Sequence, residues 1–248
     1  ASARATLERY YRNWIASGAA RVAFWYDVQL RDVDALLASR TSPRVLDAGA
    51  GTGTESLWFA LGGAQVTGID VDEAALGLAE ERLARLEAAR DAPLRCRFEC
   101  RSILETSGAF DVVWLEQAFH HMEPRAEVVT RLARLVVPGG HLVFSEANAW
   151  NPLIQAALFR LRGRRTVIEH QGVPWGHERV LTPGQLARLL DGAGFDTVAS
   201  RYFRVFPSGP RFDRLAGLEK AIGAGPWWRL VFPIFTHYSL VARRRQSV

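Results

Sequence analysis

The stretch VLDAGAGTGTES, residues 45–56, places three glycines within five positions directly after an apolar run. A buried strand that turns tightly into a helix has this composition, and we expect the backbone N–H groups of the turn to face a ligand. Dinucleotide-binding loops follow the spacing G-x-G-x-x-G. Here Gly49, Gly51 and Gly53 are spaced G-x-G-x-G, and Thr54 stands where the third glycine would be. A triphosphate-binding loop requires a lysine, which this stretch lacks.

Two carboxylates near the loop indicate the charge of the ligand. Asp47 precedes Gly49 by two residues at the end of the strand, where it would repel a pyrophosphate and attract a cation. Asp70 ends the next predicted strand, 70 − 49 = 21 residues after Gly49, a position suited to accept hydrogen bonds from ribose hydroxyls. S-adenosylmethionine combines an adenosine with sulfonium and ammonium charges. We therefore predict it as the cofactor.

Helical and strand periodicities alternate along most of the chain. Strands are predicted at residues 44–49, 65–70, 95–100, 110–115, 141–146, 195–206 and 237–245. Helices are predicted at 27–40, from the glycine loop to Gly62, after a cap at Asp72, from Pro124 to the Pro138-Gly139-Gly140 stop, from Thr182 to Gly194, and around 215–222. This alternation predicts an α/β fold with a parallel sheet covered by helices on both faces.

We expect one domain over residues 1–248. Its parts are a helical lid at 1–40, a cofactor-binding core at 41–146, a substrate-lid insertion at 147–181, and a C-terminal helix and strands at 182–248. The composition, 48% hydrophobic and 23% charged, is that of a globular protein.

The net charge of +5 does not by itself indicate nucleic-acid binding, because the arginines are scattered along the chain. No run reaches the roughly 18 apolar residues of a membrane span, and the N-terminus has no apolar signal core, so we expect a cytoplasmic location. Prolines interrupt the aromatic stretch 225–238, which we expect to pack under the last strand or line the acceptor site rather than contact a membrane. In a strand Cys96 and Cys100 lie roughly 13 Å apart, too far to bridge, and we expect two buried thiols and no metal site.

Four segments, VLDAGAGTG, VTGIDVD, FDVVWLEQAFHHM and LVVPGGHLVFSEAN, occur in order over about residues 40–150. Together they resemble the class I S-adenosylmethionine-dependent methyltransferases, in particular the broad small-molecule group. LTPGQLARLLDGAGF is a weaker match to a later helix and strand of that group. The resemblance implies a Rossmann-like, seven-stranded sheet, mostly parallel, with the last strand antiparallel.

The resemblance also implies roles for ten residues. Around the methionine end and the ribose of the cofactor it places Asp47, Gly49, Gly51 and Gly53. It assigns Asp70 to the ribose hydroxyls, Val71, Ser102 and Ile103 to the adenine, and Glu116 and Gln117 to the floor of the site. Ser102 departs from the family, which usually has an acid there, and a serine accepts the adenine amino group more weakly.

Histidines are the candidate bases, because an imidazole exchanges a proton near neutral pH. His120 and His121 follow the fourth predicted strand, at the edge where open α/β sheets bind ligands, and His177 lies in the insertion. Each could instead pack structurally. Glu146 and Asn148 could orient an acceptor or complete a turn.

Four aromatic side chains near the N-terminus, Tyr10, Tyr11, Trp25 and Tyr26, could cover the cofactor or pack the first helix. We expect methyl transfer to a small or medium-sized acceptor, at oxygen, in the biosynthesis of a natural product or glycolipid-like molecule. The alternatives are N- or C-methylation, methylation of nucleic acid, a nicotinamide-dependent oxidoreductase, and a cofactor-binding protein without catalysis.

Overall fold

Seven strands form one sheet in the order β3-β2-β1-β4-β5-β9-β8. The computed structural model describes residues 19–154, 156, 169–170, 173–174, 180–206, 210–224 and 228–246. The strands of the sheet are β1 (Arg44–Ala48), β2 (Gln65–Asp70), β3 (Cys96–Cys100), β4 (Phe110–Glu116), β5 (Val136–Ala147), β8 (Phe195–Phe203) and β9 (His237–Arg244). β9 runs antiparallel to β5 and β8, and the other pairs are parallel. The predicted Rossmann-like sheet with its last strand antiparallel is confirmed.

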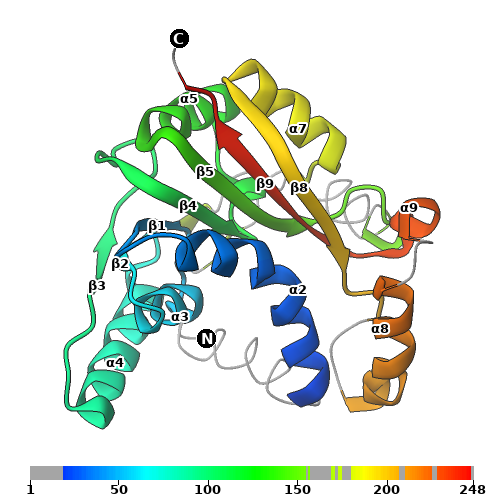
Figure 1. Ribbon diagram of the computed structural model, residues 1–248, viewed down its shortest axis with the longest axis horizontal. Coiled ribbons are helices and arrows are strands. Elements are labelled where there is room, and N and C mark those ends of the chain that lie inside the picture. The colour runs from blue at the N-terminus through cyan, green and yellow to red at the C-terminus, as the bar shows by residue number, and fades with distance from the viewer. Residues whose placement is uncertain are drawn as a thin grey trace.

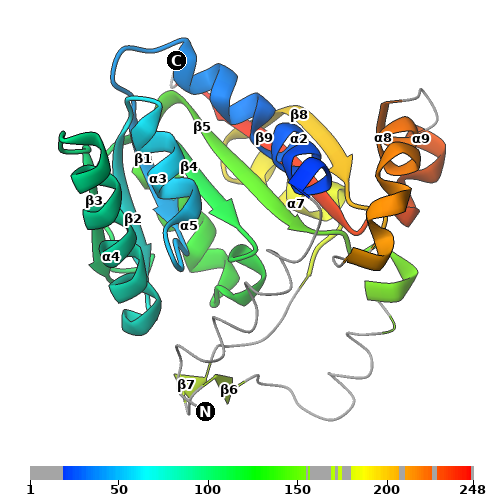
Figure 2. The ribbon, with the colours of Figure 1, turned by 90° about the horizontal axis from the view of Figure 1, so that it is seen from below.

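Helices cover both faces of this sheet. On one side lie α2 (Ala19–Ala38), α3 (Thr54–Leu61) and α4 (Glu73–Arg90), and on the other α5 (Arg125–Leu135) and α7 (Pro183–Gly192) (Figure 1). Two short helices, α8 (Ala216–Ala224) and α9 (Trp228–Val231), lie together beyond the ends of β8 and β9 (Figure 2). Three 3-10 turns, η1 (Phe119–His121), η2 (Pro210–Leu215) and η3 (Phe232–Ile234), and a hairpin of β6 (Glu169–His170) with β7 (Val173–Pro174) complete the described elements.

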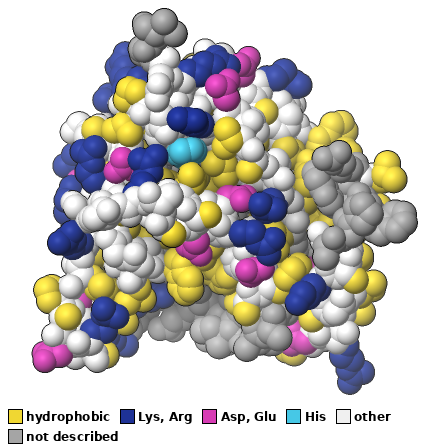
Figure 3. Space-filling model, in the orientation of Figure 1, with side chains coloured by type: hydrophobic (Ala, Val, Ile, Leu, Met, Phe, Trp, Pro, Cys, Tyr) yellow, Lys and Arg dark blue, Asp and Glu magenta, His cyan; other side chains and the backbone are white. Residues whose placement is uncertain are grey.

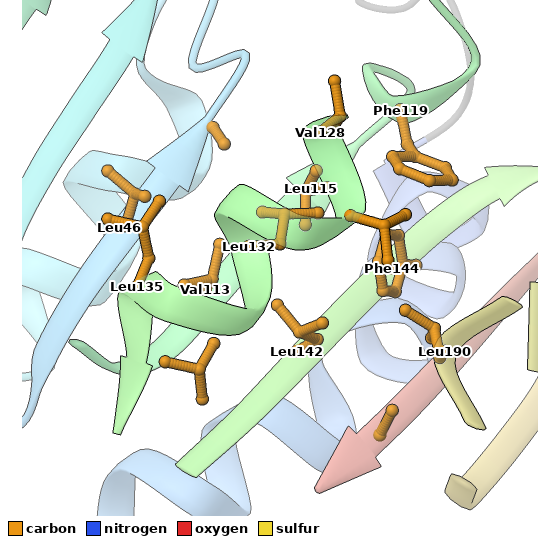
Figure 4. Packing of buried hydrophobic residues seen from close by; sticks show 14 of the residues in the cluster. Leu46, Val113, Leu115, Phe119, Val128, Leu132, Leu135, Leu142, Phe144 and Leu190 are labelled. Carbon is orange, nitrogen blue, oxygen red and sulfur yellow. The ribbon is translucent and has the colours of Figure 1, made fainter. Parts of the chain in front are cut away.

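A separate apolar core fills each side of the sheet. Under α5 and α7, strand residues such as Val113, Leu142 and Phe144 pack against Leu132 and Leu190 (Figure 4). The other core lies under α2 and α3 and contains, among others, Leu30, Val33, Phe59, Val45, Val112 and Trp114. Because both faces of the central strands are buried, these strands are apolar throughout instead of alternating with polar residues.

Local sequence signals set several of the helix ends. Asp72 accepts hydrogen bonds from the N–H groups of Ala74 and Ala75 at the start of α4. Thr182 and Gln185 form a reciprocal capping box at the start of α7, and Gly194 follows that helix with φ +88°. The predicted caps are therefore confirmed.

The beginning of β5 differs from the prediction. Residues 138–140, expected to stop α5, lie inside β5, and α5 already ends at Leu135. The strand starts early because Val136 pairs with Phe110 of β4, ahead of an irregularity between Phe110 and Val112. Pairing with a neighbouring strand, which sequence periodicity does not report, decides this boundary.

The connection between β3 and β4 is irregular. Residues 101–109, which connect β3 to β4, contain turns and no helix. A cavity of about 710 Å³ lies where the first four strands begin, lined by Arg44, Gln65, Val66, Thr67, Leu94, Arg95, Cys96, Arg97, Ser107, Gly108, Ala109 and Phe110. Basic side chains gather along the left margin of the molecule, over β3 and the start of β4 (Figure 3).

The prediction of two buried thiols is wrong. Cys100 is exposed and Cys96 is half-buried, and neither forms a disulfide. The reason is that β3 is the edge strand of the sheet, and no strand of the described residues pairs with its outer side. Around Cys100, charged residues dominate: Glu99 forms ion pairs with Arg97 at 2.9 Å and with Arg101 at 3.5 Å.

Candidate functional site

The glycine loop follows β1, which lies between β2 and β4 near the centre of the sheet. The chain order of the strands reverses between β1 and β4, and open α/β sheets bind ligands beyond the carboxyl ends of the strands at such a switch point. In β1, Asp47 pairs with Gly68 of β2 and Trp114 of β4. The topology therefore brings the loop and its carboxylate to the expected ligand edge.

The three glycines of the loop serve different purposes. Gly49 and Gly53 have φ of +88° and +73°, and a Cβ there would lie 2.4 Å from the Ala118 Cβ and 2.7 Å from the Phe98 ring. Packing within the protein thus requires both glycines. At Gly51 (φ +51°) a Cβ would meet no atom of the described residues within 4 Å. The space above Gly51 is therefore available to a ligand.

The amides of this loop do not face a ligand as expected. The N–H groups of Gly49 and Ala50 donate to the Ile69 carbonyl at 2.8 and 2.9 Å, and that of Gly53 donates to the Ala50 carbonyl at 2.8 Å. The Gly51 N–H donates to Asp70 Oδ2 at 2.8 Å. Three of these amides are engaged because the turn packs against the end of β2, and that of Gly53 is engaged within the loop itself. The loop consequently lacks the array of outward N–H donors that a pyrophosphate requires.

Buried carboxyls surround the loop. Burial and the nearby Glu55 raise the pKa of Asp47 to about 8, although the Ser56 hydroxyl donates to it at 2.6 Å. Burial also raises the pKa of Glu55, and burial with the charges of Glu55 and Glu146 raises that of Glu116. A cationic ligand would compensate these carboxylates. These three carboxyl groups therefore fit the sulfonium and ammonium charges of S-adenosylmethionine.

Asp70 has the geometry expected of a ribose acceptor. Its Oδ1 accepts from the Asp72 N–H at 2.9 Å and its Oδ2 from the Gly51 N–H, and each carboxylate oxygen has a further lone pair. Burial raises its pKa. Val71 beside it is 64% exposed and offers an apolar surface at the same edge.

The remaining predicted cofactor residues lie at the ends of β3 and β4. Ser102 is half-buried, and its hydroxyl accepts from the Leu104 N–H at 3.2 Å. Ile103 packs into the core under α5. Glu116 ends β4, and Gln117 follows it with φ +48° and donates through Nε2 to the Ser145 carbonyl at 3.2 Å. Both stretches reach the ligand edge, since they follow parallel strands.

His120 and Glu146 form a buried pair. His120 Nδ1 lies 2.6 Å from Glu146 Oε2, and both side chains are buried. Glu146 Oε1 also accepts from the Phe119 N–H at 2.8 Å, so the carboxyl from β5 holds the turn η1 in place. Because a carboxylate only accepts, Nδ1 carries the proton and Nε2 carries the lone pair of a neutral His120.

His121 lies beside His120, with ring centroids 4.0 Å apart. Burial, with the charges of His120 and Arg125, lowers the pKa of His121 to about 3, so this ring is neutral. His177, Tyr10 and Tyr11 lie outside the described residues. The structure thus brings together two of the three predicted histidines.

Other predicted side chains turn out to be structural. Trp25 is fully buried, and its Nε1 donates to Glu219 Oε2 at 3.1 Å. Asn148 is buried and donates through Nδ2 to the carbonyls of Phe232 and Phe235 at 3.1 and 3.0 Å, so it joins the end of β5 to η3. Tyr26 is half-buried and hydrogen-bonds Glu55.

Three residues at this edge were not predicted. Glu55 lies in the first turn of α3, Arg204 follows β8, and His237 begins β9. Arg204 NH1 lies 3.4 Å from His237 Nε2. Glu55 had a usable signal, since it directly follows the glycine loop, whereas only the pairing of β8 with β9 brings Arg204 to His237.

The chain is similar to methyltransferases in sequence and in fold. A family model described as a methyltransferase domain matches residues 23–200. The ubiquinone biosynthesis O-methyltransferase of Aromatoleum aromaticum is 34% identical over 163 residues, which cover 64% of this chain and 67% of that protein. The similarity spans about two thirds of the length of such curated relatives.

Solved structures agree at the level of the fold. A methyltransferase from Methanosarcina mazei superposes with a TM-score of 0.60 at 17% identity, over 84% of this chain and 95% of that one. Magnesium protoporphyrin IX methyltransferase from Synechocystis PCC 6803 gives 0.53 at 19% identity, over 87% and 77%.

The fold and the loop thus define the class of S-adenosylmethionine-dependent methyltransferases, and the chain belongs to the methyltransferase domain family. Its cofactor is S-adenosylmethionine, as the carboxylates of the loop predict. Membership of this family excludes two of the alternatives left by the sequence, a nicotinamide-dependent oxidoreductase and a cofactor-binding protein without catalysis. Within the described part of the chain, no helix combines the length and apolar character of a membrane span.

Proposed function

We propose that this protein transfers a methyl group to a hydroxyl oxygen of a small or medium-sized biosynthetic acceptor, with His120 as the base. The observation that carries the proposal is the 2.6 Å contact between His120 Nδ1 and Glu146 Oε2. A hydroxyl is a weak nucleophile until its proton is removed, and a positioned neutral imidazole performs that step. The relatives named ubiquinone biosynthesis O-methyltransferase support oxygen as the methylated atom.

The cofactor lies at the carboxyl ends of β1–β4 in this proposal. Bound S-adenosylmethionine supplies a methyl group on a positively charged sulfur, which needs no acid to leave. Asp47 and the three loop glycines border its methionine end and ribose, Asp70 accepts from the ribose hydroxyls, and Val71, Ser102 and Ile103 border the adenine. Glu116 and Gln117 form the floor. Residues 41–146 then bind the cofactor, and 1–40 and 147–181 cover the acceptor.

Glu146 prepares His120 for proton removal. By accepting the Nδ1 proton it keeps the lone pair on Nε2, and a carboxylate beside an imidazole favours the charged ring that forms when the proton arrives. Its second oxygen is held by the Phe119 N–H, so the pair is oriented before an acceptor binds. His121 and His177 are the other candidate bases. The low pKa of His121 makes it a poor proton acceptor at neutral pH.

The test compares His120→Gln and Glu146→Gln with His141→Gln, a buried histidine earlier in β5 that pairs with Val112. We expect His120→Gln to lower kcat by about 10²- to 10⁴-fold. Its affinity for S-adenosylhomocysteine, measured calorimetrically, should stay within about twofold, since Nε2 serves the acceptor and not the cofactor. His141→Gln should retain activity.

Methyl transfer from radiolabelled cofactor to catechol and to 3,4-dihydroxybenzoate provides the activity, and the product is identified by mass spectrometry and NMR. Methylation at nitrogen or carbon, or methylation of RNA and of neither small acceptor, would contradict the proposal. So would full activity of His120→Gln.

A further inference from the structure

Arg204 lies at the same sheet edge as the proposed base, on the β8–β9 side. β9 is antiparallel to β5 and β8, so its first residue, His237, pairs with Ala147 near the end of β5 and with Phe203 at the end of β8. Arg204 follows Phe203 directly and adopts φ +59°. One row further along, Glu146 pairs with Tyr238. The register therefore places Arg204 and His237 close to the carboxyl that holds His120.

A closed ring of hydrogen bonds fixes the Arg204 side chain. The Thr236 hydroxyl donates to the Arg204 carbonyl at 2.8 Å, so toward His237 Nδ1, also at 2.8 Å, that hydroxyl oxygen can only accept. Nδ1 of His237 therefore carries the proton, and Nε2 accepts from Arg204 NH1 at 3.4 Å. The Thr236 N–H also donates to the Arg204 carbonyl at 2.7 Å. The ring starts and ends on Arg204.

An aromatic ring supports the guanidinium from another direction. Arg204 Cζ lies 4.6 Å from the centroid of the Trp25 ring, within the range of a cation–π contact. Trp25 is anchored by its 3.1 Å hydrogen bond to Glu219, whose other oxygen accepts from the Val205 N–H at 2.6 Å. A long side chain held this way has lost its rotamer freedom before any ligand arrives.

The positive charge of Arg204 acts on the ligand edge. It opposes part of the rise that burial causes in the pKa of Glu116, which ends β4, and together with burial it lowers the pKa of His237. His237 is thus neutral, and the β8–β9 side of the edge carries the charge of Arg204. The β4–β5 side carries the His120–Glu146 pair. The two sides suit a molecule that loses a proton at one end and is negatively charged at the other.

We propose that Arg204 is a specificity-determining residue that binds an anionic group of the methyl acceptor, a carboxylate in the simplest case. The inference rests on the proposed O-methyltransferase function and names the acceptor class: a hydroxy acid rather than a neutral alcohol or phenol. A planar guanidinium pairs with a carboxylate through two parallel N–H donors, which gives both affinity and orientation. His237 and Trp25 are positioning residues that aim it.

The experiment measures binding, by calorimetry, to the protein saturated with S-adenosylhomocysteine. The probes are 3,4-dihydroxybenzoate and catechol, which share two hydroxyls and differ in the carboxylate. A hydrogen-bonded charge pair contributes about 1.5–3 kcal/mol, so the wild type should bind the acid about 10- to 100-fold more tightly. Arg204→Gln should reduce this preference to about twofold, and Arg204→Lys, which keeps the charge but not the planar fork, should retain part of it.

Arg201→Gln is the matched control. Arg201 lies in β8 three positions earlier and pairs with Asp32 of α2 at 2.7 and 2.8 Å, so its loss should affect stability and leave the preference unchanged. Thr236→Val opens the ring without touching the guanidinium and should weaken the preference partially. Cofactor affinity of each variant reports whether the fold is intact.

Equal affinity of the wild type for both probes, no millimolar binding of the acid, or an unchanged preference in Arg204→Gln overturns the proposal. Methyl transfer to catechol that depends on His120, together with equal binding of the two probes, overturns this inference alone and leaves the O-methyltransferase proposal standing.

Discussion

The two halves of the ligand edge are assembled in different ways. The cofactor half draws on a short stretch, in which Asp47, Gly51 and Ser56 lie within ten residues, and on Asp70 at the end of the adjacent strand. The proposed acceptor half takes His120, Glu146, Arg204 and His237 from four separate segments. Strand pairing alone brings these four together. A contiguous motif thus defines the cofactor, whereas sheet register would define the proposed acceptor site.

Burial disfavours the charged form of an acid in one half and of a base in the other. It raises the pKa of the acid Asp47 to about 8 and lowers that of the base His121 to about 3. Both groups are therefore held neutral near pH 7 in the absence of ligands. The two groups differ in their neighbours. A bound cation would favour the charged form of Asp47, whereas Arg125 and His120 disfavour the charged form of His121.

The largest effect in the cofactor half should come from Gly49→Ala. The Cβ would lie 2.4 Å from Ala118 in a left-handed backbone, so we expect unfolding free energy to fall by about 2–5 kcal/mol and cofactor binding to be lost. Gly51→Ala should cost only about 1–2 kcal/mol but still weaken binding more than tenfold, because its methyl enters the open space of the cradle. Thermal melts and calorimetry separate the two.

Gly77→Ala in α4 is the control for both glycines. In the described part of the chain, a Cβ at Gly77 meets no atom within 4 Å, and alanine in a helix is more favourable than glycine by about 0.5–1 kcal/mol. Its stability should rise slightly with unchanged cofactor affinity. If Gly51→Ala also kept full affinity, the assignment of the cradle would be wrong.

Asp47→Asn tests the charge of the cofactor half. Between the unfolded pKa of about 4 and the folded value of about 8, the folded wild type keeps a proton that the unfolded chain has lost, so its stability falls as pH rises through this window. Asparagine cannot ionise. The variant should lack this fall, so that it is more stable than the wild type at pH 8, yet bind S-adenosylmethionine at least tenfold more weakly.

Urea titrations at several pH values without cofactor measure this difference. Asp91→Asn, at the C-terminus of α4, should retain the wild-type pH dependence. A fall of the same slope in Asp47→Asn would show that another group titrates in the window.

Arg82→Met should have an intermediate effect. Arg82 NH1 of α4 donates to the Thr52 carbonyl at 2.6 Å and to Thr54 Oγ1 at 2.9 Å, so it braces the glycine loop from outside. We expect about a tenfold loss of affinity for S-adenosylhomocysteine. Arg85→Met, which removes only an exposed pair with Glu81, should change it less than twofold. Equal losses in the two variants would contradict the bracing role.

In the proposed acceptor half, the pH dependence of stability tests His121. His121 has a folded pKa of about 3 against about 6.5 unfolded, so the unfolded chain binds an extra proton between these values and wild-type stability rises with pH from 3 to 6.5. His121→Gln should show a flatter profile in denaturant titrations at pH 4 to 7. An unchanged slope would mean that His121 is protonated in the folded protein.

Sequence patterns predicted the features that depend on residues close together in the sequence. The Asp72 and Thr182 caps and the exact span of β2 follow from local chemistry, as does the placing of Asp70 at the end of β2. The engaged amides of Gly49 and Ala50 were missed because their acceptor, the Ile69 carbonyl, belongs to the adjacent strand. Arg204 and His237 were missed for the same reason, since only the Phe203–His237 pairing makes them neighbours.

The charged edge strand β3 has a consequence for the protein at high concentration. An exposed edge offers unpaired N–H and C=O groups to the edges of other molecules, which is a route to aggregation. Here Arg97, Glu99 and Arg101 alternate with other residues at that edge, and their ion pairs would have to be rearranged or dehydrated before another strand could dock. The charged side chains along this edge therefore protect the sheet from growing by addition of further chains.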